Sequence, residues 1–311
     1  MRVASLRLCA VLLLMAACLL SGAPGAHAQV KKRCFTNDAG TRCYYLYVPH
    51  GDSAGEPLMV YLHGCDDPIA HPLPSGFSLI RVADEMGFVL AYPIQDRGSN
   101  KGLCWNWDKA GHQRRGEGEP SIIAGLTTAL IDEFHLDRDR VYLGGYSAGG
   151  AMTTTLGATY PDLYAAIAPM AGAPYLTRLE ARPIIDAMGP RARPLPAFFL
   201  QTLFDEISNI VIGRTNLTQW LAADNLADPG SAPVLPTDVQ VLAVGPGVPI
   251  PLTVEHYASP RGCELARFTL PVLAEHAIGA GFVQQEHGLE IQRDLMRFLL
   301  SHRMPPPHQT C

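Results

Sequence analysis

Short apolar segments alternate with helix-like segments along almost the whole chain, and this alternation limits the possible folds more than any other feature. Most apolar segments are bounded by Gly or Pro, which is typical of buried strands. They cover 44–48, 57–62, 88–92, 141–143, 165–170, 197–201, 254–258 and 268–273. Segments with apolar residues at helical spacing lie between or after them, at 78–86, 122–134, 148–160, 215–226 and 289–301. Strands that alternate with helices form a mostly parallel sheet with helices on both faces, so the sequence predicts an α/β fold.

Composition is consistent with one large folded domain. The 311 residues are 48% hydrophobic and 17% charged, which supplies a sizeable core and excludes disorder for the bulk of the chain. No break in composition and no internal repeat divides the sequence after residue 28, so we expect a single domain over 29–311. The polar, Gly-rich segment 95–120 is expected to be a functional loop. The proline-rich segment 227–252 is expected to be an excursion from the sheet.

The first 28 residues resemble a secretory signal peptide. Two arginines lie in Met1–Arg7, an apolar run covers Leu8 to Leu20, and Ala26-His27-Ala28 follows. A membrane anchor is the weaker alternative, because the run of about 13 residues is short of the roughly 20 that span a bilayer. Cleavage before Cys18, as in a lipoprotein, is another alternative. We expect cleavage after Ala28, no membrane span in the mature chain, and secretion to the periplasm or the extracellular space.

The cysteine count supports an oxidising compartment. Six cysteines follow the signal segment: Cys34, Cys43, Cys65, Cys104, Cys263 and Cys311. An even number in an exported protein predicts disulfide bonds. Cys34 and Cys43 flank the turn-like segment 37–40 and are expected to close a hairpin. Because no Cys or His cluster has zinc spacing, we expect no metal site.

Charge argues against two classes of partner. The formal net charge is −5, and no block of like charge occurs anywhere in the chain. Nucleic acids and anionic membranes bind proteins through dense positive charge. We therefore expect neither as a partner, and we expect the protein to be a monomer.

The candidate nucleophile lies in the segment Gly145-Tyr146-Ser147-Ala148-Gly149. This G-x-S-x-G pattern is short enough to occur by chance, but it lies between a predicted strand at 141–143 and a predicted helix at 148–160. In that strand–turn–helix setting a serine is lifted clear of the sheet, and the helix N-terminus favours developing negative charge. Larger side chains at the two glycines would clash with the neighbouring strand and helix. A purely structural Gly/Ser-rich turn is the alternative to Ser147 as a nucleophile.

A serine nucleophile needs a histidine base and a carboxylate that orients the histidine. In this architecture they follow the serine in the order acid, then histidine. Asp205 follows the predicted strand 197–201 and is the expected acid, whereas three other aspartates lie in helical or excursion contexts: Asp186, Asp224 and Asp238. His276 follows the apolar run 268–273 and is the expected base. The other histidines after Asp205 are alternatives, with the one before the last helix first: His287, His256, His302 and His308.

A tetrahedral oxyanion needs two N–H donors. We expect one from Ala148, which follows the nucleophile, and the other from Cys65. His63-Gly64-Cys65 ends the predicted strand 57–62, which is where an oxyanion loop would lie; His63 as a simple core histidine is the alternative.

Three aromatic residues are candidate substrate contacts: Trp105, Trp107 and Tyr146. An indole offers a flat face for acyl or aryl groups. The alternative for the two tryptophans is that both are core residues anchoring a long loop.

The remaining disulfides are predicted from the sheet. Cys65 and Cys104 follow two strands expected to be adjacent and parallel, so both lie at the same sheet edge, and we expect them to pair. Cys263 would then pair with Cys311. A bond between Cys65 and Cys263 is the alternative.

Several segments carry a family resemblance. Leu62-His63-Gly64-Cys65, Cys104-Trp105-Asn106-Trp107 and the segment 144–152 together resemble the polyhydroxybutyrate depolymerase family of secreted esterases, which includes feruloyl and acetyl-xylan esterases. The family's acid motif resembles 201–205, and its ending resembles 263–277, which again indicates His276. The resemblance runs from Arg42 to His302 and implies an α/β-hydrolase fold and a Ser–Asp–His esterase without a cofactor.

The expected function is therefore a secreted serine esterase acting on carboxylic esters of the hydroxyalkanoate oligomer or polyester type. Its expected partner is a small ester or an oligoester substrate. A feruloyl or acetyl-xylan esterase acting on plant polysaccharide esters is the alternative within the same class. A non-catalytic binding protein on a hydrolase scaffold is the alternative from another class.

Overall fold

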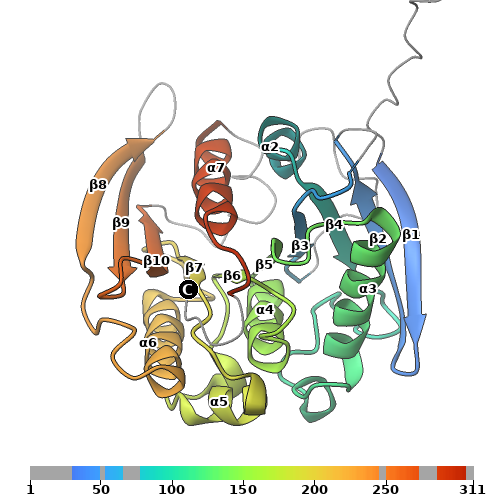
Figure 1. The fold of residues 1–311 in the computed structure, drawn as a ribbon, viewed down its shortest axis with the longest axis horizontal. Helices are drawn as coiled ribbons and strands as arrows, with labels where there is room; N and C mark the ends of the chain where they lie inside the picture. Colours follow the sequence, from blue (N-terminus) through green and yellow to red (C-terminus); the bar gives the residue numbers. More distant parts are fainter. Residues whose placement is uncertain (1–29, 50–52, 66–77, 245–249, 273–285, 306–311) are drawn as a thin grey trace, which may run out of the picture.

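The computed structural model describes residues 30–49, 53–65, 78–244, 250–272 and 286–305. Its described part is built around one sheet of ten strands, with helices on both faces (Figure 1). The strand order is β1-β2-β4-β3-β5-β6-β7-β10-β9-β8. The expected signal peptide lies outside the described residues.

The ten strands have the following bounds: β1 Val30–Asn37, β2 Gly40–Tyr47, β3 Leu58–Leu62, β4 Val89–Ile94, β5 Val141–Tyr146, β6 Ala166–Met170, β7 Ala197–Leu200, β8 Asp238–Val244, β9 Ile250–Ala258 and β10 Glu264–Pro271. The helices are α2 Ser78–Met86, α3 Gly118–Phe134, α4 Ala148–Thr159, α5 Arg182–Met188, α6 Ile210–Ala227 and α7 Glu286–Leu300, with short 3₁₀ turns such as η2 Ala110–His112. Each strand and helix predicted from the sequence is present, with its ends shifted by a few residues.

The middle of the sheet is parallel, as predicted. β4, β3, β5, β6, β7 and β10 run in one direction, and each pairs in parallel with its neighbour. Antiparallel strands flank this centre, with β2 and β1 on one side and β9 and β8 on the other. Because parallel strands all end at the same edge, the loops after β3, β5, β7 and β10 are brought together there.

Each face of the sheet has its own hydrophobic core. Within β3, Leu58, Val60 and Leu62 contribute to the core that contains residues of α3, α4, α5 and α6. Met59 and Tyr61 contribute to the other core, which contains residues of α2 and α7. The two helix layers are visible in Figure 1, below and above the sheet. The alternation along a fully buried strand places successive side chains on opposite faces, which explains why β3 is apolar throughout.

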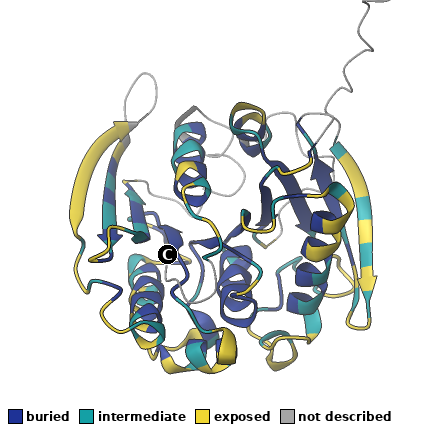
Figure 2. Cartoon of the chain, in the orientation of Figure 1, coloured by how far each residue is buried: buried dark blue, intermediate teal, exposed yellow. Residues whose placement is uncertain are grey.

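The segment 227–252 differs from its prediction. It was expected to leave the sheet, but β8 lies within it and adds an outer strand against β9. Residues 238–243 of β8 are exposed, and Val241 is 75% exposed (Figure 2). This strand is held by antiparallel pairing with β9 and not by burial of its side chains. A sequence pattern that detects buried strands therefore misses it.

The hairpin of β1 and β2 confirms one predicted disulfide. Cys34 and Cys43 lie opposite each other in the register and are bonded, with their Cα atoms 3.8 Å apart. Cys263 is also disulfide-bonded, but its predicted partner, Cys311, lies outside the described residues.

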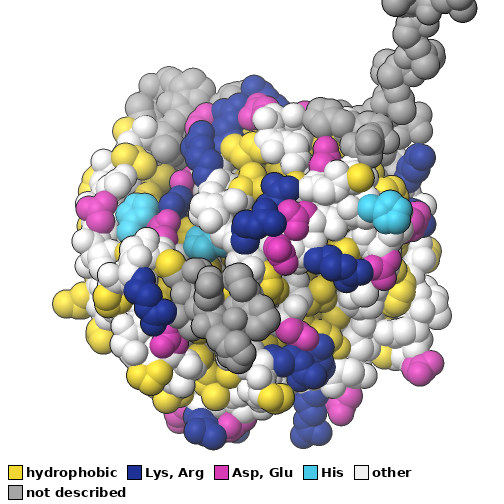
Figure 3. Space-filling view, viewed as in Figure 1, with side chains coloured by type: hydrophobic (Ala, Val, Ile, Leu, Met, Phe, Trp, Pro, Cys, Tyr) yellow, Lys and Arg dark blue, Asp and Glu magenta, His cyan; other side chains and the backbone are white. Residues whose placement is uncertain are grey.

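The surface carries charges of both signs. Lys and Arg side chains are interspersed with Asp and Glu over the face shown in Figure 3, and many form ion pairs, such as Arg115 with Asp162 at 2.7 Å. Among the residues that the structure describes, no helix is both long enough and apolar enough to cross a membrane.

Candidate active site

The predicted site residues follow the carboxyl ends of parallel strands. Cys65 comes after β3, Ser147 directly after β5, and Asp205 after β7. His276 comes after β10, but it lies outside the described residues. Since these strand ends share one edge of the sheet, the structure brings the loops of the three described residues to the same side of the molecule.

Ser147 lies in a sharp turn between β5 and α4. Its backbone has φ 55° and ψ −118°, a conformation that costs a non-glycine residue on the order of 1–3 kcal/mol. The Ser147 N–H donates to the carbonyl of Met170 at the end of β6, at 2.9 Å. The next residue, Ala148, begins α4. The strand–turn–helix setting predicted for the serine is therefore present.

The two glycines of the motif are required by close packing of the backbone. A Cβ atom added at Gly149 would lie 2.1 Å from the carbonyl oxygen of Leu62, and one added at Gly145 would lie 2.5 Å from the carbonyl oxygen of Gly149. Backbone atoms cannot move away as a flexible side chain can. The turn therefore excludes side chains at both positions, as the sequence predicted.

The loop after β3 lies beside this turn. A Cβ atom added at Gly64 would be 3.4 Å from the Cβ of Ser147. Cys65 follows Gly64 directly, and Ala148 begins α4 on the other side of the serine. This arrangement is compatible with N–H donors from Cys65 and Ala148, whose role as an oxyanion hole stays a prediction.

His63 is both a core residue and part of this loop. It is buried, and its ring packs against those of Tyr92 and Trp105, with centroids 6.0 Å and 5.4 Å away. The backbone N–H of Gln95 lies 2.9 Å from Nε2, and the carbonyl of Gly64 lies 2.6 Å from Nδ1. Because an amide N–H can only donate, Nε2 accepts; Nδ1 therefore carries the proton and donates to Gly64.

Asp205 is held rigidly at its strand end. It is 3% exposed, and its Oδ1 accepts the backbone N–H groups of Ile207 at 2.9 Å and Ser208 at 2.7 Å. Oδ2 lies 3.4 Å from the Nε2 of Gln201. These bonds form a side-chain turn that fixes the carboxylate. The role of Asp205 as the catalytic acid stays a prediction.

The chain that leads to His276 leaves the sheet next to Asp205. β10 pairs in parallel with β7, and the N–H of Leu203 donates to the carbonyl of Pro271 at 3.3 Å. His276 is five residues beyond Pro271, so an extended chain reaches about 17 Å from that point. The role of His276 as the base stays a prediction.

The alternative aspartates have other surroundings. Asp186 lies on α5 in an exposed ion pair with Arg182, and Asp238 begins the exposed strand β8. Asp224 is buried on α6, where it accepts the N–H of Leu195 at 2.9 Å. Burial raises the pKa of Asp224 well above its usual value, which suits a structural carboxyl group.

The candidate substrate contacts are buried to different degrees. Trp105 is 1% exposed and belongs to a hydrophobic core, and Tyr146 is likewise buried in the other core. Trp107 is partly buried at the margin of the first core and keeps exposed surface. Trp105 therefore fits the alternative of a core residue that anchors the loop. Trp107 is the better candidate for contact with a substrate.

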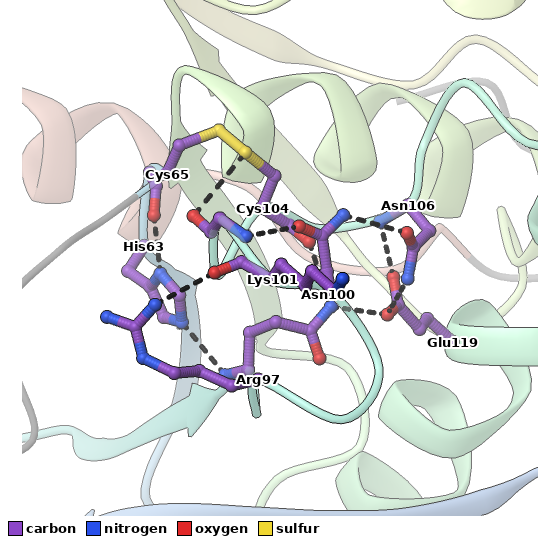
Figure 4. Close-up of a disulfide and its surroundings, with 11 residues drawn as sticks. His63, Cys65, Arg97, Asn100, Lys101, Cys104, Asn106 and Glu119 are labelled. Carbon is purple, nitrogen blue, oxygen red and sulfur yellow. Dashed lines mark hydrogen bonds between the residues drawn. A yellow bond between two sulfur atoms is a disulfide. The ribbon is translucent and has the colours of Figure 1, made fainter.

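The disulfide predicted between Cys65 and Cys104 is present (Figure 4). It joins the loop after β3 to the C-W-N-W segment, over a sequence separation of 39 residues, with the Cα atoms 4.2 Å apart. The bond therefore ties Cys65, an expected oxyanion donor, to a second loop at the same edge of the sheet.

We expect Cys104→Ser to lower kcat for a simple ester by about 10²-fold, because a displaced Cys65 N–H loses much of what an oxyanion donor contributes. The control is Cys34→Ser, which removes the hairpin disulfide and is expected to lower Tm with little change in kcat. Steady-state kinetics well below both Tm values tests the difference. Equal kcat values for the two variants would contradict a role for the Cys65–Cys104 bond in catalysis.

The sequence analysis did not predict a buried polar cluster around Glu119, near this disulfide. Glu119, on the first turn of α3, is 0% exposed and pairs with Arg42 of β2 at 2.8 Å. Gln95 and Asn106 donate hydrogen bonds to the same carboxylate, and His112 Nδ1 lies 3.8 Å from its Oε2. A glutamate in a helix N-terminal turn is usually solvated, and no local pattern marks this one as buried.

Among the described residues, no group of three or more His, Cys, Asp or Glu side chains is placed to hold a metal ion.

Comparisons with known proteins agree with this geometry. A family model described as Esterase PHB depolymerase matches residues 42–212. Poly(3-hydroxyalkanoate) depolymerase C of Paucimonas lemoignei is 36% identical over 163 residues, which are 52% of this chain and 39% of that protein. Feruloyl esterase B of Thermothelomyces thermophilus is 35% identical over 129 residues, 41% of this chain and 43% of that protein. Each match spans less than half the length of the relative.

A solved structure identifies the fold. Acetyl xylan esterase from Aspergillus awamori has a TM-score of 0.63 to this chain, over 87% of this chain and 98% of that one, at 17% sequence identity. The fold is that of the α/β-hydrolases, as predicted.

Proposed function

Since the chain belongs to the Esterase PHB depolymerase family, we propose that it is a serine hydrolase of carboxylic esters. The observation that carries this proposal is the strained Ser147 turn at the sheet edge to which Asp205 and the Cys65 loop also belong. A positive φ at a non-glycine residue persists only where the surrounding structure maintains it, and such residues cluster at active sites.

The proposed reaction has two steps. Ser147 Oγ attacks the ester carbonyl carbon while His276 takes its proton, and the tetrahedral oxyanion receives hydrogen bonds from the N–H groups of Cys65 and Ala148. His276 then protonates the leaving alkoxide, which leaves an acyl group on Ser147. Water, activated by His276, hydrolyses this acyl-enzyme, and Asp205 holds the imidazole in the required tautomer throughout. No cofactor or metal takes part in this scheme.

Hydroxyalkanoate oligomers or polyester-type esters are the proposed substrates. The relative from Paucimonas lemoignei carries a depolymerase name of this kind and is 36% identical. Feruloyl or acetyl-xylan esters are the second candidate, because other relatives carry those names and the exposed part of Trp107 offers a stacking face for an aryl group.

We propose that 29–311 acts as a single catalytic domain and as a monomer on a soluble ester. The disulfides Cys34–Cys43 and Cys65–Cys104 are typical of oxidising compartments. They support secretion after removal of residues 1–28.

Hydrolysis of p-nitrophenyl acetate and butyrate is the direct test of the proposed activity. We expect turnover of both by the purified mature chain. A panel of hydroxybutyrate oligomers and methyl ferulate then separates the substrate classes through kcat/KM. A folded protein that hydrolyses none of these esters would support the binding-protein alternative.

A further inference from the structure

The carboxylate of Glu119 is the centre of a buried polar cluster near the candidate oxyanion loop (Figure 4). Oε1 accepts hydrogen bonds from Arg42 at 2.8 Å, Gln95 Nε2 at 2.5 Å and Asn106 Nδ2 at 2.8 Å. Oε2 accepts the backbone N–H of Asn106 at 2.7 Å. Glu119 is 0% exposed, and burying a charge is costly unless it is paired and hydrogen-bonded. Donors from β2 and from the loop that follows β4 compensate this cost.

One arm of the cluster leads to the peptide unit that contains the Cys65 N–H. Glu119 holds the side chain of Gln95, whose backbone N–H donates to His63 Nε2 at 2.9 Å. His63 Nδ1 in turn donates to the carbonyl of Gly64 at 2.6 Å. The Gly64 carbonyl and the Cys65 N–H belong to one planar peptide unit. A bond that fixes the carbonyl therefore fixes the direction of the N–H.

The other arm leads to the disulfide partner of Cys65. The two hydrogens of Gln95 Nε2 are both used, one on Glu119 and the other on the carbonyl of Cys104 at 3.0 Å. Asn106, two residues beyond Cys104, is held by Glu119 through its backbone and its side chain. Cys104 is bonded to Cys65. Both routes from the carboxylate therefore converge on Cys65, one through His63 and one through sulfur.

We propose that Glu119 is a positioning residue for the oxyanion hole, which orients the Cys65 N–H through Gln95 and His63 on one side and through Cys104 on the other. The proposal rests on the esterase function proposed above and adds to it a residue that does not touch the substrate. A preorganised donor costs no reorganisation during the reaction. Glu119 supplies that preorganisation by accepting donors at both of its oxygens, which a glutamine amide, with one acceptor oxygen, cannot do.

The primary test is Glu119→Gln. The amide replaces one oxygen with an NH₂ group, which then faces a donor, either the Asn106 N–H or the Gln95 and Arg42 side chains. We expect kcat to fall about 10- to 100-fold with little change in KM, which is less than the roughly 10²–10³-fold cost of removing a donor entirely. Affinity for an alkyl trifluoromethyl ketone, which forms a tetrahedral adduct with Ser147, should fall by the same factor. Affinity for the matching methyl ketone, which binds without that adduct, should not.

Asp224→Asn is the matched control, because Asp224 is a carboxyl group buried to a similar degree on α6, where it accepts the N–H of Leu195. We expect it to leave kcat and the affinity for the trifluoromethyl ketone unchanged, whatever its effect on Tm. Each variant is assayed at the same number of degrees below its own Tm. Equal losses of kcat in the two variants would show that Glu119 has a structural role only.

A pair of variants at His63 keeps the proposal testable if Glu119→Gln does not fold. His63→Asn retains an N–H donor near the position of Nδ1 and can still bond the Gly64 carbonyl, whereas His63→Leu cannot. We expect the leucine variant to lose at least about tenfold more kcat than the asparagine variant, as a misplaced oxyanion donor would. Indistinguishable kcat values for the pair overturn the proposal.

The outcome also separates this proposal from the one on which it rests. A wild-type protein that neither hydrolyses esters nor binds the trifluoromethyl ketone overturns both. An active wild type whose kcat is unchanged by Glu119→Gln overturns the positioning role alone and leaves the esterase function intact.

Discussion

Replacement of Ser147 by alanine is expected to lower kcat for p-nitrophenyl butyrate by about 10⁶-fold, because no other hydroxyl can take its place in the reaction. A residual rate of about 10³-fold over water should remain, since the oxyanion donors and the binding site persist. Folding should be unaffected, because the turn is held by backbone contacts such as the Ser147 N–H to the Met170 carbonyl. The measurement is steady-state kinetics, with residual wild-type enzyme quantified by active-site titration.

Two comparisons sharpen this test. Ser301→Ala, at the end of α7, removes a hydroxyl that bonds only nearby groups of the same helix end and should leave kcat unchanged. His276→Ala should match the loss in Ser147→Ala, whereas His287→Ala should remain active. The reverse result for the two histidines would show that the base has been assigned to the wrong residue.

Asp205→Asn is expected to lower kcat by about 10⁴-fold, the cost of a wrongly oriented imidazole tautomer. The reason lies in the hydrogen bonds of the carboxylate. Oδ1 accepts two backbone N–H groups, from Ile207 and Ser208, so an asparagine keeps its carbonyl oxygen there and places its NH₂ in the position of Oδ2. That NH₂ then donates to the histidine, which favours the tautomer that cannot accept the proton of Ser147.

Asp205→Asn keeps the two backbone hydrogen bonds at Oδ1 and loses the 3.4 Å bond from Gln201 Nε2 to Oδ2, so we expect the variant to fold normally. Its Tm should lie close to that of the wild type, and circular dichroism should be unchanged. Asp224→Asn serves again as the control, because it replaces a buried carboxyl group on α6, away from the carboxyl ends of the parallel strands. If Asp205→Asn retained kcat within tenfold of the wild type, another residue would have to orient the base.

The pattern of apolar residues was sufficient to predict the strands at the buried centre of the fold. β3, β4 and β6 are fully or almost fully buried on both faces, so each is a continuous apolar run that stands out in the sequence. β8 was missed because it is an exposed edge strand flanked by prolines, held by pairing with β9. The start of α6 was placed five residues late, because Ile210 to Arg214 follow the cap formed by Asn209 and contain a glycine.

The turn at Ser147 and two of the disulfides were also predictable. The turn and the Cys34–Cys43 bond depend on short-range relations along the chain, whereas the Cys65–Cys104 bond, with a sequence separation of 39, depends on the order of the strands. The glycines around Ser147 reflect close backbone packing, and Asp205 lies five residues beyond the end of β7. The Cys34–Cys43 bond spans one hairpin. Cys65 and Cys104 required only the order of two adjacent parallel strands.

The burial of Glu119 and the difference between Trp105 and Trp107 became visible only in the folded molecule. Arg42 is 77 residues away from Glu119 in sequence, and a charged side chain is buried only where distant segments supply its partners. Likewise, Trp105 packs against His63, whereas Trp107, two residues later, lies at the margin of the same core. Side-chain burial is set by contacts between segments remote in sequence, and for that reason local patterns predicted the turn at Ser147 but not the buried cluster around Glu119.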